Sequence, residues 1–427
     1  MPERQMEIIR DPLWNNIAVD TLAMRLVDTP AFQRLRYVRQ LGLAFLVYPG
    51  ATHTRFEHAL GTYHLARRAL ALLDERGALA GISKVDCSTV RVAALLHDIG
   101  HYPFSHALEE IGALHHEEVA RPLITSGAVA DALSGAMSDD TPDQIMALIR
   151  GASASPLQRL ISGSLDLDKL DYLRRDAFMC GVPYGEIDVD RLLNSLTVVQ
   201  ADDGAEIGIV EKGLSALESL LFARYQMYRN VYWHHAVRSA TAMYKRLVED
   251  AVNAGSLDAA TLAGFTDEGL LHDLARRAPS PLLVALRERR LFKRAFQCPA
   301  GDLAPEAAEW IADDRTLTRR VEDAVAAELG LNRGELLLDY PTKTQMLGLD
   351  IPVQRRNGDV FRLTTHGEGA INLPKLAEEF YRSARWLRVF TRRPVQLRRD
   401  QVLGIVTRSR DDVCSSLDHG RSLLLSS

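Results

Sequence analysis

The sequence predicts a mainly α fold, in which a helical bundle carries additional C-terminal helices and two small β-hairpins. Apolar residues recur at helical spacing through most of the chain, whereas short alternating runs typical of strands are few. The 427 residues correspond to two or three units of the usual domain size of roughly 150 residues. A chain of this length can bury a large core, which excludes a peptide hormone, a zinc-knuckle module and a small toxin.

The first predicted helix covers residues 54–73, where apolar side chains recur at i, i+3, i+4 and i+7 and a second apolar face indicates burial on most sides. A second helix begins near Asp86, contains an apolar block over residues 92–96 and ends near Gly100. Further helical patterns cover residues 158–176, 214–253, 270–277 and 373–389.

Two β-hairpins interrupt these helices. Residues 195–199 and 206–210 flank an Asp-Asp-Gly turn, and residues 351–354 and 360–363 flank an Asn-Gly turn. Helical periodicity weakens and charge rises over residues 255–279, so we expect one domain over residues 1–254 and a C-terminal helical region with a small hairpin over residues 255–398. Residues 399–427 have no periodicity and many serines, so we expect a disordered tail or a non-native extension there.

The composition is that of an ordinary globular chain, with 47% hydrophobic and 25% charged residues. The net charge of −5 argues against a constitutive nucleic-acid coat protein, although a local basic cleft could still bind nucleic acid. Four scattered cysteines without CxxC spacing indicate a reducing cytoplasm and neither a disulfide framework nor a structural zinc site. Because the sequence contains no secretory or membrane-spanning apolar segment, we expect a protein that is neither secreted nor inserted in a membrane.

Histidines cluster in one part of the sequence, since eight of the thirteen lie between His53 and His116. His58 lies inside the first predicted helix, and the pair His97 and Asp98 ends the second, where an unpaired ionisable pair would cost several kcal/mol. A divalent cation is one partner that removes this cost, and imidazole with carboxylate suits manganese, iron, nickel or zinc. His58 alone is more often a satisfied core histidine, but the adjacent His97 and Asp98 favour a metal site.

A later helix offers a further carboxylate. Asp168, Tyr172 and Asp176 recur at i, i+4 and i+8, with Lys169 beside that stripe, so one face presents carboxylates, a cation and a phenol. A solvated charged face is the alternative. Leucines at positions 167, 170 and 173 make another face apolar, which leaves the charged face lining a shared cleft or facing water.

A second polar helix face joins Arg224, Tyr228 and Tyr232 at the same spacing. An arginine can bind phosphate through its planar fork, and aromatic rings can stack on a base. Taken alone, these rings would more often belong to a hydrophobic core. The combination therefore indicates a nucleotide only together with the histidine and aspartate residues.

Three sequence blocks resemble one known family. They are HTRFEH at residues 53–58, HDIGHYPFSH at residues 97–106 and DLDKLDY at residues 166–172. In this order they resemble the HD-domain phosphohydrolases, and within them are most similar to the deoxynucleoside triphosphate triphosphohydrolases. The resemblance covers about residues 11–245 and implies an HD-domain helical bundle as the catalytic core.

The resemblance also implies a metal site and a reaction. His58, His97, Asp98 and Asp168 would bind one divalent ion, and magnesium could accompany the substrate phosphates. The implied reaction is metal-dependent hydrolysis of a deoxynucleoside triphosphate, with dGTP the first choice, to deoxynucleoside and inorganic triphosphate. His101, His106 and His116 match the neighbouring and acid/base histidines of the family. We choose His106 as the general acid because Glu109 lies one turn away, with His116 as the alternative.

The same resemblance implies contacts to the substrate and to other chains. The substrate-binding positions are Gln40, Leu41, Arg55, Lys169, Tyr172, Asp176, Arg224, Tyr228 and Tyr232. Asp28, Gln33 and Arg36 match positions that bind a nucleotide activator between subunits in some members, and a homo-oligomer, dimer or tetramer, is expected. Tyr228 and Trp233 replace the histidine and glutamine usual in the family, which leaves the base preference open.

Two other functions fit the sequence less well. An HD phosphohydrolase could act on another phosphate ester, such as a nucleoside monophosphate or a cyclic dinucleotide. A nucleotide-sensing protein without turnover is the non-enzymatic alternative, and it is disfavoured because all four metal positions are filled. Analysis of the products distinguishes the three, since they release triphosphate, orthophosphate or nothing.

Overall fold

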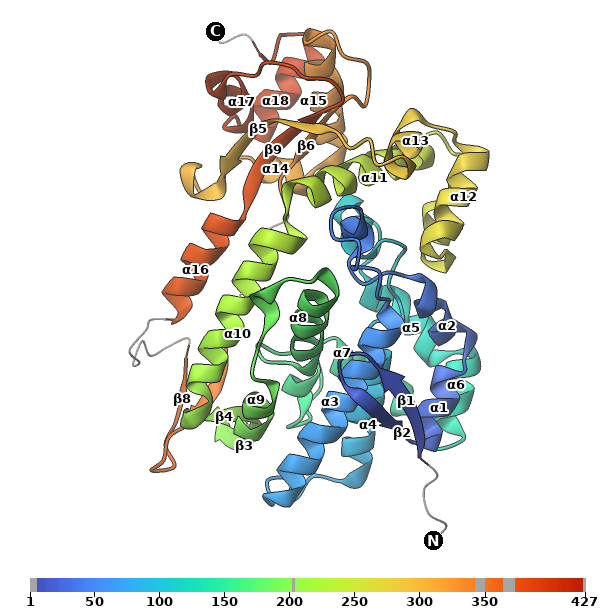
Figure 1. Ribbon diagram of the computed structural model, residues 1–427, viewed down its shortest axis with the longest axis vertical. Helices are drawn as coiled ribbons and strands as arrows, with labels where there is room; N and C mark the ends of the chain where they lie inside the picture. The colour runs from blue at the N-terminus through green and yellow to red at the C-terminus, as the bar shows by residue number, and fades with distance from the viewer. Residues whose placement is uncertain (1–5, 202–203, 342–349, 364–372, 425–427) are drawn as a thin grey trace.

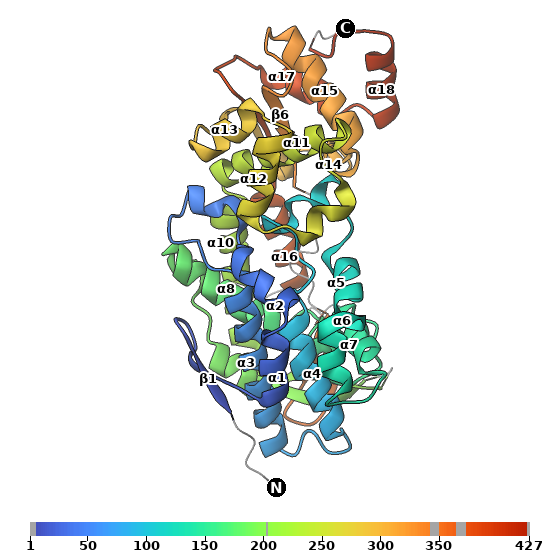
Figure 2. The ribbon, with the colours of Figure 1, turned by 90° about the vertical axis from the view of Figure 1, so that its right-hand side faces the viewer.

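The structure is a computed structural model that describes residues 6–201, 204–341, 350–363 and 373–424. It is mainly α, as the sequence predicts. The molecule is elongated, with the N-terminal helices at one end and the sheet β5-β9-β6 with α15, α17 and α18 at the other (Figures 1 and 2). Within the described residues, no helix combines the length and the apolar character needed to span a membrane.

The N-terminal part contains β1 (Glu7–Asp11), β2 (Asn15–Val19), α1 (Thr21–Val27), α2 (Pro30–Arg34), α3 (Arg55–Glu75) and α4 (Lys84–Leu96). The antiparallel hairpin of β1 and β2 was not predicted. Helices α3 and α4 confirm the two predicted helices, and α3 is buried on most sides. Ser83 caps α4 by accepting a hydrogen bond from the Asp86 N–H at 3.0 Å. The helix ends at Leu96, so His97 and Asp98 lie at its C-terminal end.

Five helices follow, namely α5 (His116–Thr125), α6 (Gly127–Ser134), α7 (Thr141–Ile149), α8 (Leu167–Cys180) and α9 (Val189–Ser195). The predicted single helix over residues 158–176 is wrong in its first half, which contains only a 3₁₀ turn at Gln158–Leu160. Helix α8 begins at Leu167 because the Asp166 side chain accepts a hydrogen bond from the Lys169 N–H at 3.0 Å. This cap places Asp168 in the first turn of α8, which packs against α3.

The predicted helix over residues 214–253 is broken in the structure. Helix α10 (Leu214–Met227) runs into a π-helical turn, Tyr228–Tyr232, and α11 (His235–Asn253) begins after it. The Trp233 N–H donates to the Tyr228 carbonyl at 2.8 Å, which closes the wider π turn. The apolar pattern that predicted one helix over residues 214–253 did not reveal this break.

Both predicted hairpins are confirmed, but they join into one sheet with the strand order β3-β4-β7-β8. These strands are β3 (Leu196–Ala201), β4 (Gly204–Val210), β7 (Pro352–Gln354) and β8 (Val360–Arg362). The sheet forms because β4 pairs in parallel with β7, with Ile209 opposite Val353. Asp202 and Asp203 of the first predicted turn lie outside the described residues.

The C-terminal part contains α12 (Asp267–Arg277), α13 (Pro281–Arg287), β5 (Lys293–Pro299), α14 (Glu309–Asp313), α15 (Arg315–Glu328), β6 (Leu336–Asp339), α16 (Leu373–Ala384) and β9 (Trp386–Thr391). The antiparallel sheet β5-β9-β6 was not predicted. The predicted helix over residues 373–389 therefore ends at Ala384. Its last residues form β9 instead, because β9 is the central strand and pairs with β5 on one side and β6 on the other.

The expectation of a disordered tail is wrong for residues 399–424. This segment forms α17 (Arg399–Val406) and α18 (Arg410–Asp418) near the C-terminal end (Figure 1). Val402, Ile405 and Val413 are buried in the cluster that contains α15. Each helix is too short to establish an apolar period by itself, so its order depends on the surface that it covers.

Among the residues that the structure describes, buried apolar side chains form three main clusters. One joins the helices from α1 to α10, and another joins the C-terminal sheet to α15, α17 and α18. The remaining one packs residues 102–108 against α11, α12 and α13. Residues beyond position 254 therefore support a loop that follows α4, while the proposed domain division between residues 254 and 255 stays a prediction.

Candidate active site

The four predicted metal ligands lie together where α3, α4 and α8 meet. His58 Nε2 lies 2.9 Å from Asp168 Oδ1 and 3.2 Å from His97 Nε2, and His97 Nε2 lies 3.6 Å from the same Asp168 oxygen. Asp98 lies at the edge of this group, with its oxygens 3.6 Å from His58 Nε2 and 3.5 Å from His97 Nε2. The predicted set is thus brought together by three separate helices.

The orientation of the two imidazoles suits a cation. His58 Nδ1 lies 2.8 Å from Asp171 Oδ2, and His97 Nδ1 lies 2.9 Å from the carbonyl oxygen of Ala94. Because an acceptor holds each Nδ1, a neutral ring keeps its proton there and presents the lone pair of Nε2. Two such lone pairs and a carboxylate oxygen then lie close together, and a divalent ion fits this set of donor atoms.

Asp171 is a site residue for which sequence reasoning gave no role. Trp14 Nε1 donates to Asp171 Oδ1 at 2.5 Å, and Arg175 Nε donates to Oδ2 at 2.8 Å. A Cβ atom on Gly61 would lie 1.9 Å from Asp171 Oδ1, so this glycine lets the carboxylate pack against α3. The position of Asp171, one turn after Asp168 on α8, was the signal that could have identified it.

Mutual hydrogen bonds shift the pKa values of the predicted metal ligands. Burial alone would lower the pKa of His58, but hydrogen bonds to Asp168 and Asp171 raise it to about 10. Burial alone would raise the pKa of Asp168, yet hydrogen bonds with His58 and His97 hold it well below its usual range. The carboxylate therefore stays charged, and a bound metal would take the place of the imidazolium proton.

Asp98 is held on its other side by a buried arginine. Arg55 contacts the Asp98 carboxylate through one nitrogen and the Ser105 hydroxyl through another. His101 Nε2 lies 3.1 Å from Asp98 Oδ1. Its guanidinium is already engaged in these contacts, and the predicted role of Arg55 in binding substrate stays a prediction.

A second histidine group lies next to the ligands. Glu109 Oε1 lies 2.9 Å from His116 Nδ1, and Glu109 Oε2 lies 3.4 Å from His106 Nδ1, so one carboxylate serves both predicted acids. The His101 and His116 rings stack with centroids 3.9 Å apart. The His106 side chain is 57% exposed and that of His116 is 13% exposed. Burial lowers the pKa of His116 despite its bond to Glu109.

Predicted substrate residues of α8 and α10 face the same region. Tyr172 lies 6.5 Å from the His58 ring and 6.4 Å from the Tyr232 ring, centroid to centroid. The buried Arg224 guanidinium lies 5.7 Å from the centre of the Tyr228 ring. The π-helical turn after α10 thus places Tyr228 and Tyr232 beside α8.

The ammonium group of Lys169, which the sequence predicted to bind substrate, already has two partners within the chain. Its ammonium group donates to the Gly163 carbonyl at 2.9 Å and contacts the Asp166 carboxylate. A phosphate would therefore compete with Asp166 for this cation.

Three of the predicted substrate-binding residues, Gln40, Leu41 and Asp176, are connected through His53. Its Nε2 lies 2.8 Å from Asp176 Oδ1, and the Tyr232 hydroxyl donates to Asp176 Oδ2 at 2.7 Å. The Gln40 N–H donates to the His53 carbonyl at 3.0 Å, and Leu41 is partly buried beside it. Gln40 Oε1 is buried without a hydrogen-bond partner in the described part of the chain, so a ligand hydroxyl would satisfy it.

Comparisons with known proteins identify the family. The HD domain model matches residues 55–173, and the HD associated region model matches residues 187–395. The chain belongs to the HD-domain phosphohydrolases. It is 38% identical over 307 residues to an uncharacterised protein of Methanocaldococcus jannaschii, covering 72% of this chain and 63% of that relative.

Two further similarities complete this assignment. The deoxynucleoside triphosphate triphosphohydrolase SAMHD1 of Bos taurus is 33% identical over 264 residues, covering 54% of this chain and 45% of that enzyme. The chain thus spans less than two thirds of either curated relative. A hypothetical protein from Aquifex aeolicus superposes with a TM-score of 0.71 at 28% identity, covering 91% of this chain and 96% of that one.

The predicted activator residues of this HD-domain phosphohydrolase lie on the surface near α1 and α2. Asp28 is exposed at the end of α1. Arg36 Nε donates to Gln33 Oε1 at 2.8 Å, and Gln33 Nε2 donates to the Val27 carbonyl at 2.8 Å. Their contacts within the chain leave the activator role a prediction.

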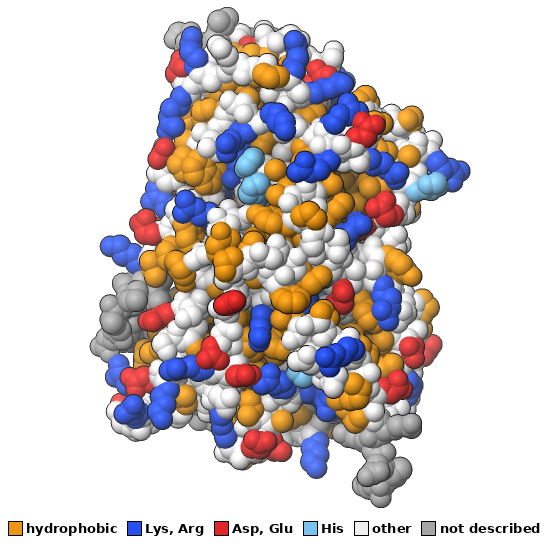
Figure 3. Space-filling model, viewed as in Figure 1, with side chains coloured by type: hydrophobic (Ala, Val, Ile, Leu, Met, Phe, Trp, Pro, Cys, Tyr) orange, Lys and Arg blue, Asp and Glu red, His pale blue; other side chains and the backbone are white. Residues whose placement is uncertain are grey.

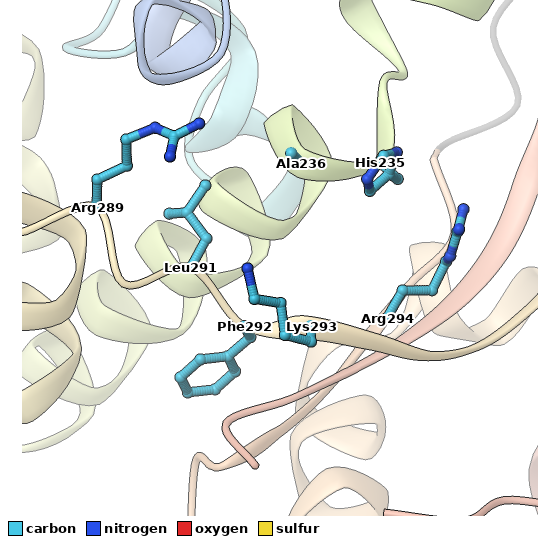
Figure 4. Close-up of a pocket in the computed structure, with 7 residues that line it drawn as sticks. All are labelled: His235, Ala236, Arg289, Leu291, Phe292, Lys293 and Arg294. Atoms are coloured by element: carbon cyan, nitrogen blue, oxygen red, sulfur yellow. The ribbon is translucent and has the colours of Figure 1, made fainter. Parts of the chain in front are cut away.

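A basic pocket lies apart from these groups in the HD-domain phosphohydrolase. It has a volume of about 300 Å³ and is lined by His235, Ala236, Arg289, Leu291, Phe292, Lys293 and Arg294 (Figure 4). Basic side chains and histidines also gather in the upper part of the face in Figure 3. None of the lining residues belongs to the metal group or to the group of His101, His106, Glu109 and His116.

Proposed function

We propose that this HD-domain phosphohydrolase hydrolyses deoxynucleoside triphosphates, with dGTP the first substrate to test, to deoxynucleoside and inorganic triphosphate. The convergence of His58, His97, Asp98 and Asp168 beside a separate histidine and glutamate group supports it most. Similarity to the triphosphohydrolases of Bos taurus and Homo sapiens supports the substrate class.

The residues of the chain would divide the chemistry between them. A divalent ion held by the four ligands would act as a Lewis acid on the α-phosphoryl group and lower the pKa of water. His106 would donate a proton to the leaving 5′ oxygen, because its exposed ring is held by Glu109 at the edge of the ligand group. His116 is buried and its pKa is lowered, which favours His106 as the acid.

The tyrosines and basic residues would bind and orient the nucleotide. Arg224, Lys169 and Tyr172 would contact the phosphates. Tyr228 and Tyr232 would lie against the base. Gln40 and Asp176 would bind the 3′ hydroxyl and leave little room for a 2′ hydroxyl. We further propose that the protein acts in the cytoplasm, since its four cysteines are free, and as a homo-oligomer like the family members it resembles.

The test is product analysis with purified protein, Mn²⁺ and each dNTP, with products separated by ion exchange. We expect triphosphate as the phosphate product. Asp98→Asn and Asp168→Asn should each lose bound metal and turnover, whereas Asp190→Asn, a 72% exposed carboxylate on α9, should behave as wild type. Full metal content and full rate in either ligand variant would contradict the site.

The acid is tested separately. His106→Ala should lower kcat by about 10²- to 10⁴-fold with metal retained. His116→Ala is the matched variant, since both rings share Glu109. An unchanged kcat in His106→Ala together with a large loss in His116→Ala would assign the acid to His116.

One observation favours a second function, hydrolysis of a smaller phosphate ester. Two of the predicted substrate-binding cations are already engaged, Lys169 with Asp166 and Arg55 with Asp98 and Ser105. A triphosphate needs more positive charge than a monophosphate. Comparable kcat/KM for dGTP, GTP and dGMP, with orthophosphate as product, would favour this alternative over the triphosphohydrolase.

A further inference from the structure

Asp267, the first residue of α12, connects two segments of the proposed site. It is 2% exposed and lies outside residues 55–173, which the HD domain model matches. Asp267 Oδ1 accepts a hydrogen bond from the Phe104 N–H at 2.8 Å. Asp267 Oδ2 accepts from the Arg39 N–H at 3.1 Å and pairs with the Arg39 guanidinium at 3.3 Å. Arg39 directly precedes Gln40, and Phe104 lies two residues before His106.

The segment that Asp267 holds has an unfavourable backbone. Phe104 and Ser105 have φ angles of 58° and 66°, so two consecutive residues with side chains occupy the left-handed region. Such residues persist only where surrounding contacts impose the conformation, and they concentrate at functional sites. The contacts around this turn therefore decide whether it keeps its shape.

Residues of two other segments pack against the Phe104–Ser105 turn. A Cβ atom on Gly42 would lie 2.8 Å from the Phe104 carbonyl oxygen, so the chain after Gln40 packs directly on this peptide. The Phe104 ring lies 4.8 Å from the Tyr244 ring, centroid to centroid. Asp267 supplies the charged contact in this arrangement, and the described structure gives the Phe104 N–H no other acceptor.

The shape of the turn reaches the metal ligands. The Ser105 hydroxyl contacts Arg55, and Arg55 contacts the Asp98 carboxylate. His106 follows directly and reaches Glu109. A change at Phe104 would therefore displace both the acid and the arginine that holds a ligand.

We propose that Asp267 is a positioning residue for the reaction, which holds the Phe104–Ser105 turn in its left-handed conformation and thereby places His106 and the Ser105–Arg55–Asp98 contacts. The proposal rests on the proposed function for its kinetic effect, but not for its structural effect. It assigns to the HD associated region a direct part in shaping the HD site.

The charge of Asp267 fits this role. Arg39 and Arg34 face it from the N-terminal segment, Tyr244 from α11, and Glu268 is its neighbour on α12. Burial raises the pKa of Asp267 to about 6, and the Phe104 and Arg39 N–H groups oppose this shift. At neutral pH the group is a carboxylate, which can accept from both N–H groups at once.

The test compares Asp267→Asn with Asp273→Asn, a matched variant of another buried carboxylate on α12, which pairs with Arg277. An amide has one acceptor oxygen, so it can serve only one of the two N–H groups. We measure kcat and KM for dGTP with Mn²⁺, bound metal, and hydrogen exchange of peptides containing residues 104–107. If Asp267→Asn does not fold, Asp267→Glu takes its place. This variant keeps the negative charge but moves the carboxylate oxygens away from the two N–H groups.

We expect Asp267→Asn to lower kcat by at least tenfold with KM within about threefold of wild type, metal retained, and exchange faster over residues 104–107. Asp273→Asn should match wild type in all four measurements. Unchanged exchange, or a kcat within tenfold of wild type in the folded variants, would overturn the proposal. If wild-type protein does not hydrolyse dGTP, the proposed function fails, and the exchange of residues 104–107 alone then decides the positioning claim.

Discussion

Replacement of Asp171 by asparagine tests whether the carboxylate that contacts His58 Nδ1 orients His58 for metal binding. Asp171 is fully buried and accepts hydrogen bonds from His58, Trp14 and Arg175. An asparagine of the same shape has one acceptor oxygen, and its NH₂ group would face donors that now meet an oxygen. The His58 ring would lose the partner that holds the proton on Nδ1 and turns Nε2 toward the other ligands.

The magnitude follows from the geometry. The bond between His58 Nδ1 and Asp171 is 2.8 Å long and both side chains are buried, so water cannot replace the lost acceptor. Changes to a partner of a metal-binding histidine typically weaken metal binding by about 10- to 100-fold. This corresponds to about 1.4–2.7 kcal/mol of binding free energy. Arg175 keeps its contact with Asp11 at 2.8 Å, so we expect the variant to fold.

The assay is a calorimetric titration of metal-free protein with Mn²⁺ at fixed pH, with circular dichroism to verify folding. Asp190→Asn serves as the control, because this exposed carboxylate pairs with Arg68 at the surface of α3, away from the metal ligands. A folded Asp171→Asn variant whose Kd for Mn²⁺ lies within about threefold of wild type would refute the reasoning.

Three further predictions concern stability. Arg238→Met should lower the unfolding free energy by roughly 3–5 kcal/mol in urea denaturation, because it leaves the buried Asp339 without its closest cation; a loss below about 1 kcal/mol would contradict this. Gly61→Ala should lower the stability by about 1–3 kcal/mol and weaken Mn²⁺ binding, since the new methyl group collides with Asp171; unchanged melting and titration curves would argue against it. His64 should destabilise the protein in acid, because burial and nearby arginines lower its pKa in the folded state to about 4. In the unfolded state its pKa is the ordinary 6.5, so between pH 6.5 and 4 the unfolded state binds a proton that the folded state does not, and stability falls as the pH falls. The Tm of wild type should therefore fall more between pH 6.5 and 4 than that of His64→Gln, and parallel Tm curves would exclude this contribution.

The sequence allowed the prediction of elements whose order depends on local patterns. The first two helices follow from apolar spacing, and α4 carries a visible start signal in Ser83 and Asp86. The turn residues between β7 and β8 were equally visible, because Asn357-Gly358 favours a hairpin. The motif order also placed His58, His97, Asp98 and Asp168 in one predicted group, and these side chains do converge.

Other features depend on contacts between distant residues. Strand β9 and helices α17 and α18 are ordered by the surfaces they pair with or cover, so their own sequences resembled a helix and a disordered tail. The break after α10 lies inside a segment whose apolar pattern predicted one continuous helix. Local periodicity carries no information on such choices, because tertiary contacts decide between conformations of similar local energy.

The sequence by itself determined the family, the mainly α class and the residue types that could bind a metal, because these are carried by short motifs and by apolar spacing. Only the tertiary structure decided what surrounds them. Asp171 lies behind His58, Asp267 holds a turn 163 residues away in the chain, and Lys169 and Arg55 are already engaged by carboxylates. Such contacts depend on three-dimensional packing, in which side chains far apart in sequence satisfy the charges and hydrogen-bonding groups that folding buries.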